Sequence, residues 1–360
     1  MTETTLKVCT ADTVTPKIIF RAVLFFFAAF VFFAALLHII LPPAIGLYAA
    51  LRSEKLILLN QLKDRATTAV FGSSHVHNGF DPRTFDQALA GTSLSTTSLN
   101  LGIEGGSQSE QRAMALQFVS RLKPHPDQAC FVLLELNAGA NFTDDHLVHP
   151  RAINIYDWQT VRFISRLSPP SLGRGRAVGR LLYALAASGL YYSNVGMLSN
   201  LIFNPQPDQD MLADETNDDR RGLLTPHQEA GSASLIHLFA TIDRSMKPSP
   251  ESLLPGNYDL LAELQHDSPV RNVHFVYWVS PRADNLDQYP AYPAEITVSG
   301  VTTPILSIAR PDLYPALYQP QNWVDDSHLS APGAALLGNL LGSQLLDWYK
   351  AHPQPMACGG

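Results

Sequence analysis

The side-chain types needed for nucleophilic acyl transfer stand near the two ends of the chain. Ser73 and Ser74 follow a short apolar run that ends at Gly72. Far downstream, Asp325 stands three residues before His328. A serine hydroxyl is a weak nucleophile until a neutral imidazole accepts its proton and a carboxylate holds that imidazole in the correct tautomer. The chain therefore carries the three components of a catalytic triad.

The residues around the two serines predict a strand, a tight turn and a new helix. Val70 and Phe71 suit a buried strand, and Gly72 permits a sharp backbone turn. Asp81 followed by Pro82 is typical of a helix N-cap and first helical position. The serines are thus expected at the carboxyl end of a strand, the edge of an open α/β sheet where ligands bind. The alternative is that both serines only bond turn backbone, which is common for this residue type.

Gly-Ser-Ser near the start and Asp-x-x-His near the end together resemble the SGNH (GDSL-like) hydrolase superfamily. The resemblance implies Ser74 as the nucleophile, His328 as its base and Asp325 as the side chain that orients the histidine. Ser73 stands where the family often has an aspartate. That difference weakens the match but does not affect the triad.

The resemblance also implies donors for the oxyanion. After a second expected strand, residues 95–101, comes a glycine-rich turn in which Gly105 matches the family position whose N–H holds the oxyanion. A third strand, residues 130–136, leads to Asn137 and Asn141. The family has Gly-x-Asn-Asp at this place, with the Asn side chain donating to the oxyanion. This chain departs from that motif, so the resemblance leaves either Asn137 or Asn141 as the donor. Ordinary turn chemistry is the alternative role of all three residues.

Two rival sites carry weaker signals. His75 and His77 alternate and, with His328, offer metal ligands on one strand face, but no carboxylate or cysteine follows at ligand spacing. Asp145 and His146 offer a second aspartate–histidine pair, but they lack the Leu-Ser-x-x-Gly and terminal helix that follow His328. We expect neither a metal nor another cofactor.

The order of elements predicts an α/β fold. Strand, helix, strand, helix, strand, insertion, strand and helix imply a parallel sheet with right-handed crossovers in a three-layer α/β/α domain, as in SGNH and flavodoxin-like folds. The last strand is expected at 272–280 and the last helix extends to Trp348. The family resemblance covers roughly residues 66–145 and 270–349.

The hydrolase-like domain is expected over residues 66–349, with a helical insertion at about 144–268 and a C-terminal tail at 350–360. Within the insertion, the apolar residues 181–190 are too few to span a membrane, and a core helix is favoured over a membrane-grazing one. The acidic stretch 205–221 lacks the glycine and spacing of an EF-hand, so we interpret it as a solvated loop.

Residues 22–41 contain no Asp, Glu, Lys or Arg and have about the length needed to cross a bilayer. Two prolines and further apolar sequence follow without a cleavage site, which favours an uncleaved transmembrane anchor over a signal peptide. Lys17 and Arg21 flank its amino end, so the positive-inside rule predicts a cytoplasmic tail at 1–21. Residues 42–65 are then a juxtamembrane linker, and the remainder is extracytoplasmic, either periplasmic or at the cell surface.

Composition excludes some partners. The 25 Lys and Arg against 32 Asp and Glu give a net charge of -7, which offers no basic surface for nucleic acid.

The 360 residues allow about two average domains or one α/β domain with an insertion. Cys9, Cys130 and Cys358 suggest no disulfide framework; Cys130 is expected to be simple core and Cys358 to lie in a frayed tail.

These patterns predict a membrane-anchored, extracytoplasmic serine esterase or O-acyltransferase that acts on ester-linked acyl groups. Its location implies an acylated envelope glycan or exopolysaccharide as substrate. The layout is similar to that of single-anchor SGNH-like proteins that work with membrane acyltransferases, which implies such a partner here. The alternative from another class is a catalytically inactive scaffold or glycan-binding component of a polysaccharide export or modification complex.

Overall fold

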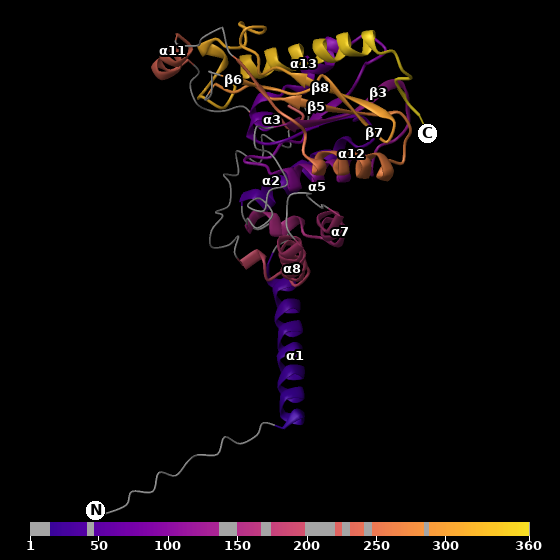
Figure 1. The fold of residues 1–360 in the computed structure, drawn as a ribbon, viewed down its shortest axis with the longest axis vertical. Helices are drawn as coiled ribbons and strands as arrows, with labels where there is room; N and C mark the ends of the chain where they lie inside the picture. Colours follow the sequence, from indigo (N-terminus) through magenta and orange to yellow (C-terminus); the bar gives the residue numbers. More distant parts are fainter. Residues whose placement is uncertain are drawn as a thin grey trace, which may run out of the picture.

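The computed structural model describes residues 15–41, 47–136, 150–166, 174–198, 220–224, 231–240, 247–283 and 288–359. They form an α/β body from which one helix projects (Figure 1). The helices are α1 (Pro16–Ile40), α2 (Leu47–Leu62), α3 (Ser74–Gly79), α4 (Pro82–Leu89), α5 (Gln108–Val119), α7 (Trp158–Arg166), α8 (Arg174–Tyr192), α11 (Ala233–Ala240), α12 (Pro255–Asp267) and α13 (Ala331–Ala351), with 3₁₀ turns η1 (Pro150–Ile155) and η2 (Pro320–Asn322). The strands are β1 (Thr68–Phe71), β2 (Ser98–Asn100), β3 (His125–Leu136), β4 (Lys247–Pro250), β5 (Val273–Val279), β6 (Gln288–Ala291), β7 (Glu295–Val298), β8 (Val301–Ser307) and β9 (Ala357–Cys358).

The central sheet is mixed and mostly parallel, with the strand order β2-β1-β3-β5-β8-β7. β2, β1, β3, β5 and β8 lie parallel, so their carboxyl ends meet at one edge. β7 pairs antiparallel with β8, and β9 pairs antiparallel with β3. The predicted sheet was parallel throughout, so these two pairings are corrections. The two-residue Ser299-Gly300 connection, with φ of 50° and 80°, is a hairpin turn that marks the β7–β8 pair.

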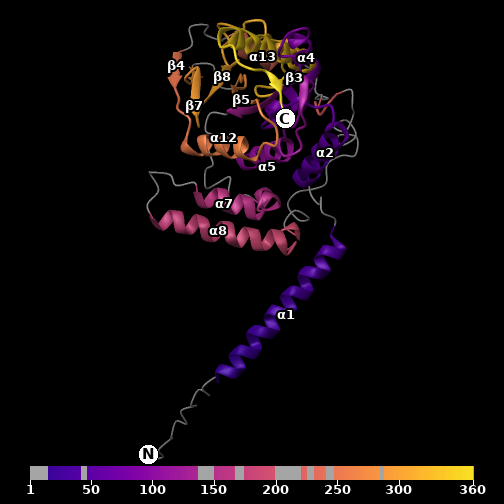
Figure 2. The ribbon, with the colours of Figure 1, turned by 90° about the vertical axis from the view of Figure 1, so that its right-hand side faces the viewer.

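Each face of the sheet packs against its own helices, because alternate strand residues point in opposite directions. Ala69 and Phe71 join an apolar cluster that includes α5 and α12. Val70 joins a second cluster that includes α4 and α13. Figure 2 shows α13 and α4 on one side of the sheet and α12 and α5 on the other. Burial on both faces explains the near-continuous apolar sequence of β3 from Cys130 onward.

Two helices that pack on the sheet lie within ranges predicted as a juxtamembrane linker and as a helical insertion. In the expected linker at 42–65, α2 buries Leu51 and Leu58 in the same cluster as α5. Lys55 on α2 is also fully buried, and its Nζ donates to the carbonyl of Asn100 at 3.3 Å. At the end of the expected insertion, α12 packs on this cluster as the helix that precedes β5.

The apolar segment 181–190 belongs to α8, and its environment differs from the predicted core helix. Ala184 and Ala187 are buried, but Leu182 is 61% exposed and Leu185 is 43% exposed. The core prediction is therefore wrong for these leucines. The acidic stretch lies outside the described residues except for its last two positions.

α1 is 25 residues long and is the one described helix that is long and apolar enough to span a membrane. It begins at Pro16, before the predicted start at Ala22, because the apolar sequence extends through Ile18, Ile19 and Phe20. Figures 1 and 2 show it extending away from the α/β body.

Cys130 and Cys358 form a disulfide that ties the last strand to β3, with Cα atoms 5.3 Å apart. Cys358 is fully buried in β9. The predicted core position of Cys130 is confirmed, since Cys130 is fully buried, but the expectations of no disulfide and of a frayed tail at Cys358 are wrong. The two cysteines are 228 residues apart, so no local spacing pattern indicates the pair.

Replacing Cys358 by serine should destabilise the protein by about 2–5 kcal/mol, because the crosslink restricts the unfolded chain. The measurement is the thermal midpoint of the full chain in detergent, with and without reductant. Cys9→Ser is the matched control and should leave the midpoint unchanged. Equal midpoints for Cys358→Ser and the oxidised parent would contradict the prediction.

Candidate active site

Ser74 stands immediately after the turn that ends β1, as the first residue of α3. Ser73 caps this helix, and its Oγ accepts a hydrogen bond from the His75 N–H at 3.3 Å. Only glycine fits at position 72, because a Cβ there would lie 2.3 Å from a carboxylate oxygen of Glu135. The predicted strand is confirmed as β1 and the predicted helix from Pro82 as α4, whereas the short helix α3 between them was not predicted. The turn after β1 presents Ser74 at the carboxyl edge of the sheet.

Asp325 and His328 belong to a short loop whose two ends are joined by a backbone hydrogen bond. The Val324 N–H donates to the His328 carbonyl at 3.0 Å. Trp323 is fully buried, and its Nε1 donates to the Leu317 carbonyl at 2.9 Å. The loop leads directly into α13, whose N-cap is Ser330. This arrangement fixes the loop between a buried indole and a helix start.

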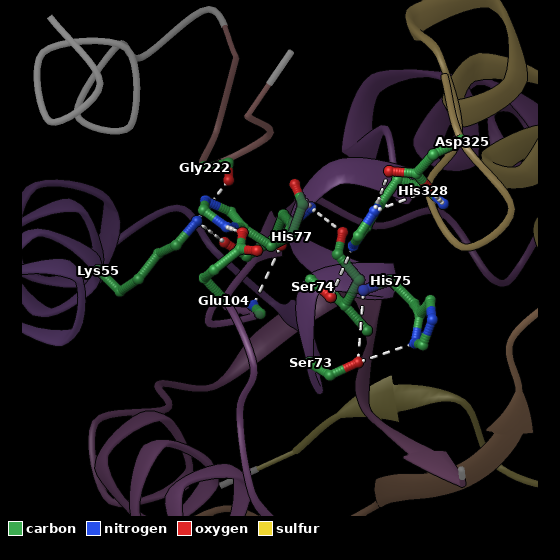
Figure 3. Close-up of polar contacts among 12 residues, drawn as sticks. Lys55, Ser73, Ser74, His75, His77, Glu104, Gly222, Asp325 and His328 are labelled. Carbon is green, nitrogen blue, oxygen red and sulfur yellow. Dashed lines mark hydrogen bonds and ion pairs between the residues drawn. The ribbon is translucent and has the colours of Figure 1, made fainter. Parts of the chain in front are cut away.

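The structure brings the three predicted triad residues together (Figure 3). His328 Nε2 lies 2.9 Å from Ser74 Oγ, although 254 positions separate the two residues. His328 Nδ1 lies 2.8 Å from Asp325 Oδ2. When Nδ1 carries the proton and donates it to the carboxylate, Nε2 is left to accept a hydrogen bond from the serine hydroxyl. This is the donor–acceptor order that activates a serine.

The environment of Asp325 keeps its carboxylate ionised. Burial acts to raise the pKa of Asp325, but hydrogen bonds from the His328 ring and from two backbone N–H groups outweigh it and lower the pKa. Those N–H groups belong to Ser327 and His328, and each lies 2.7 Å from Oδ1. The neighbouring Asp326 is exposed and accepts from the Ser327 hydroxyl instead. Asp325, and not Asp326, is therefore the carboxylate that contacts the His328 ring.

Glu135 supports the turn that carries the serines, and it was not identified from the sequence. This side chain is 1% exposed near the end of β3. It accepts hydrogen bonds from the Ser73 N–H at 2.7 Å and from Ser280 Oγ at 2.6 Å. In addition, His75 Nδ1 lies 3.3 Å from Glu135 Oε1. One buried carboxylate thus joins the ends of β1, β3 and β5.

The charge of Glu135 is compensated within the site. Its burial acts to raise the pKa, but the contacts with His75, Ser280 and the Ser73 N–H outweigh this effect and hold the pKa below its ordinary value. A charged residue within the otherwise apolar sequence Phe-Val-Leu-Leu-Glu-Leu is the signal that marks the position. Buried carboxylates persist when they are paired, so such a residue indicates a polar network at the strand end.

Asn100 fixes the glycine-rich turn after β2 against α3. Its buried Nδ2 donates to the carbonyls of Val76 at 2.6 Å and Phe80 at 2.9 Å. Its Oδ1 accepts from the Gly102 N–H at 3.1 Å. The turn and α3 are therefore held as one unit. Asn100 is a second supporting residue that the sequence interpretation did not single out.

The candidate oxyanion residues are only partly described. Gly105 is exposed and has a φ of 57°, a backbone conformation that favours glycine. Its turn lies beside the serines, since the Ile103 N–H donates to the Gly72 carbonyl at 3.0 Å. Asn137 and Asn141 lie outside the described residues.

The metal alternative does not match the observed geometry. His75 and His77 lie on α3 rather than on a strand, so their alternation turns them to different sides. His75 pairs with Glu135, whereas His77 is buried with Nδ1 3.6 Å from Glu104 Oε2 (Figure 3). Among the described residues, no group of three His, Cys, Asp or Glu is placed to hold a metal ion. The rival Asp145–His146 pair lies outside them.

Replacing Glu135 by glutamine should lower the thermal midpoint at neutral pH, because an amide cannot reproduce the carboxylate's contacts with both donors and His75. Since its folded-state pKa is lowered, the Glu135 carboxylate stabilises the fold above its ordinary value of 4.5, and this contribution disappears as the pH falls through the folded-state value. The gap between parent and variant should therefore shrink below pH 4.5.

The measurement for Glu135 is the thermal midpoint of both proteins across that pH range. Glu295→Gln is the control, because Glu295 is a solvent-exposed carboxylate whose Oε2 lies 3.7 Å from Nε2 of the exposed His352. A gap between parent and Glu135→Gln that does not change with pH would show that the carboxylate's charge is not what matters at this position.

No family model matches this chain, and no curated protein matches it. Within the described residues, the Ser74–His328–Asp325 hydrogen-bonded array is the arrangement with the clearest chemical capacity.

Proposed function

We propose that the protein is a serine esterase or O-acyltransferase of the SGNH-like kind, acting on ester-linked acyl groups. The observation that carries the proposal is the continuous hydrogen-bonded array from Ser74 through His328 to Asp325. A turn serine that only satisfied backbone groups would need neither an imidazole at 2.9 Å nor a carboxylate behind it.

In the first half-reaction, Ser74 Oγ attacks the acyl carbon of the ester while His328 Nε2 accepts the hydroxyl proton. The ionised Asp325 stabilises the imidazolium that forms. Collapse of the tetrahedral intermediate breaks the bond to the alcohol oxygen, which takes the proton from Nε2. The products are a free alcohol and an acyl-serine enzyme.

In the second half-reaction, His328 Nε2 accepts a proton from the incoming nucleophile, which attacks the acyl-serine carbonyl. Water yields the free acid and makes the protein an esterase. A sugar hydroxyl yields a new ester and makes it an acyltransferase. Both outcomes return the proton to Ser74 Oγ, so the same three side chains serve either reaction.

The tetrahedral intermediates need donors for the negative oxygen. We assign this role to the N–H groups of Ser74 and Gly105 and to the side-chain amide of Asn137 or Asn141. Each such donor contributes about 3 kcal/mol to lowering a barrier of this type. The close packing of the Gly105 turn against the Gly72 carbonyl supports its inclusion.

We further propose that the sheet and its two helical covers constitute the three-layer α/β/α arrangement of SGNH and flavodoxin-like folds. The separate apolar clusters on the two faces support it. So does the placement of Ser74 and Glu135 at the carboxyl edge of parallel strands, the edge at which ligands bind in such folds.

The proposed location is extracytoplasmic, with α1 as a single transmembrane anchor. Lys17 and Arg21 at its amino end favour a cytoplasmic N-terminus. The Cys130–Cys358 disulfide supports an oxidising compartment for the α/β body. An esterase held there meets acylated envelope glycans or exopolysaccharides, and a membrane acyltransferase is the fitting partner.

Ser74→Ala and His328→Ala should each reduce acetyl-ester turnover by about a thousandfold or more, and the double variant should be little worse, because triad members act as one unit. Asp325→Asn should also reduce turnover. The measurement is hydrolysis of a small acetyl ester by the full-length protein, together with the thermal midpoint of each variant.

Ser73→Ala and Asp326→Asn are the matched neighbours, and their turnover should stay much closer to that of the parent. Activity that survives Ser74→Ala, or additive losses from Ser74→Ala and His328→Ala, would remove the hydrolase proposal. The scaffold or glycan-binding alternative would then be the better account.

A phosphatase that needs export should be active when fused after Gly360, and a reporter that works only in the cytoplasm should be inactive there. The reason is that α1 is the one described helix able to span a membrane, and its flanking charges favour a cytoplasmic N-terminus. The measurement compares a phosphatase, which needs export, with a reporter that works only in the cytoplasm. Activity of the cytoplasmic reporter alone would reverse the proposed orientation and remove the envelope substrate.

A further inference from the structure

α8 exposes a continuous apolar face to its surroundings. The exposed positions recur at helical spacing and lie on one side of the helix. None of them carries a charge: they are Val178, Gly179, Leu181, Leu182, Leu185, Ala186, Gly189, Leu190 and Tyr192. The face that packs inward includes the buried Ala184, Ala187 and Ser188, and Tyr183 and Tyr191 pack against the same apolar cluster as α5 and α12. If water alone surrounded α8, its leucines would be expected to face the protein and its polar residues the solvent.

α7 connects α8 to the α/β body. On α5, the buried Arg112 makes two hydrogen bonds of 2.6 Å to Glu263 of α12. The same guanidinium donates to Thr160 Oγ1 at 3.2 Å and lies 4.4 Å from the ring centroid of Phe163, both on α7. α7 in turn packs along α8. The exposed face of α8 therefore has a fixed direction relative to the sheet.

The carboxyl end of α8 meets the carboxyl end of α1. His38 Nε2 lies 2.9 Å from the Tyr192 carbonyl oxygen, and Asn194 Nδ2 donates to the Leu37 carbonyl at 3.2 Å. The Tyr192 hydroxyl accepts from the Trp158 N–H at 3.1 Å, and the Trp158 side chain is exposed. Tryptophan and tyrosine concentrate where a membrane meets water. These contacts thus place aromatic side chains where α1 would leave the bilayer.

We propose that α8 lies in the headgroup region of the membrane that α1 spans, with its leucine face toward the acyl chains. Figure 2 shows α7 and α8 between the sheet and α1, on the side of the body from which α1 emerges. The proposal rests on α1 being a membrane span and is independent of the hydrolase activity. It makes α8 a second membrane contact that fixes how the active-site edge is held above the surface.

The favoured occupant of this surface is an anionic phospholipid bilayer. The α8 sequence contains three arginines, at 174, 176 and 180, and no acidic residue. The chain as a whole has a net charge of -7, so this segment departs from the average in the direction that anionic headgroups attract. Leucines on one face and arginines in the same helix are the combination typical of helices that lie in the interface.

The test uses the full-length protein in vesicles of phosphatidylglycerol and phosphatidylethanolamine, with Cys9→Ser as background. A polarity-sensitive bimane probe is attached at Leu182→Cys, and at Leu185→Cys as a second reading. The control is Leu313→Cys, which is 57% exposed. Its neighbour Tyr314 contacts Gln344 of α13, the helix on the far side of the body from α1 (Figure 1). Quenching is measured with spin-labelled lipid and with aqueous iodide.

We expect several-fold stronger quenching by spin-labelled lipid at positions 182 and 185 than at 313, and the reverse for iodide. Phosphatidylcholine vesicles should weaken the lipid quenching at α8 while α1 keeps the protein bound. Iodide quenching at 182 equal to that at 313 would show an aqueous face and overturn the proposal. Protection from both quenchers would also overturn it, in favour of a protein partner or second copy. Equal lipid quenching in both vesicle types would overturn the preference for anionic lipid.

Discussion

The parallel alignment of β1, β3 and β5 is the constraint on which the candidate site depends. Phe71 of β1 is in register with Leu134 of β3, and Leu134 is in register with Tyr277 of β5. β3 and β5 end at the same level, two residues beyond the level of Phe71, so the residues after β1 and those at the ends of β3 and β5 meet at one edge. The Ser73 N–H, the Glu135 carboxylate and the Ser280 hydroxyl are joined there by two short hydrogen bonds. A change of register by one residue would separate these groups.

Ser74 and His328, the proposed nucleophile and base, reach this edge from opposite ends of the chain. Ser74 arrives on the turn after β1, whereas His328 arrives on the loop before α13. α13 packs against α4 and α3 on the face formed by the second apolar cluster, so the burial of its leucines also places the histidine. The apolar burial that stabilises the fold therefore also holds His328 close to Ser74. Asp325 then needs only its local backbone donors and the His328 ring to remain ionised.

Local patterns in the sequence predicted the local structure well. The Asp81 N-cap and the Asp325–His328 spacing both have the expected geometry, because each depends on residues within one turn. Features made by distant partners were missed. Glu135 has its partners on two other segments, and the bond from Cys130 to Cys358 joins positions 228 apart. Composition likewise predicted an apolar α8 but not which of its faces would be covered.

Direct evidence for a reactive Ser74 would test the central claim most sharply. The measurement is labelling of the full-length protein with a fluorophosphonate, followed by mass-spectrometric mapping of the modified residue. We expect one adduct, on Ser74, that is lost in His328→Ala although this variant retains the Ser74 hydroxyl. Absence of labelling, modification of Ser73 or another serine instead, or undiminished labelling in His328→Ala would contradict it.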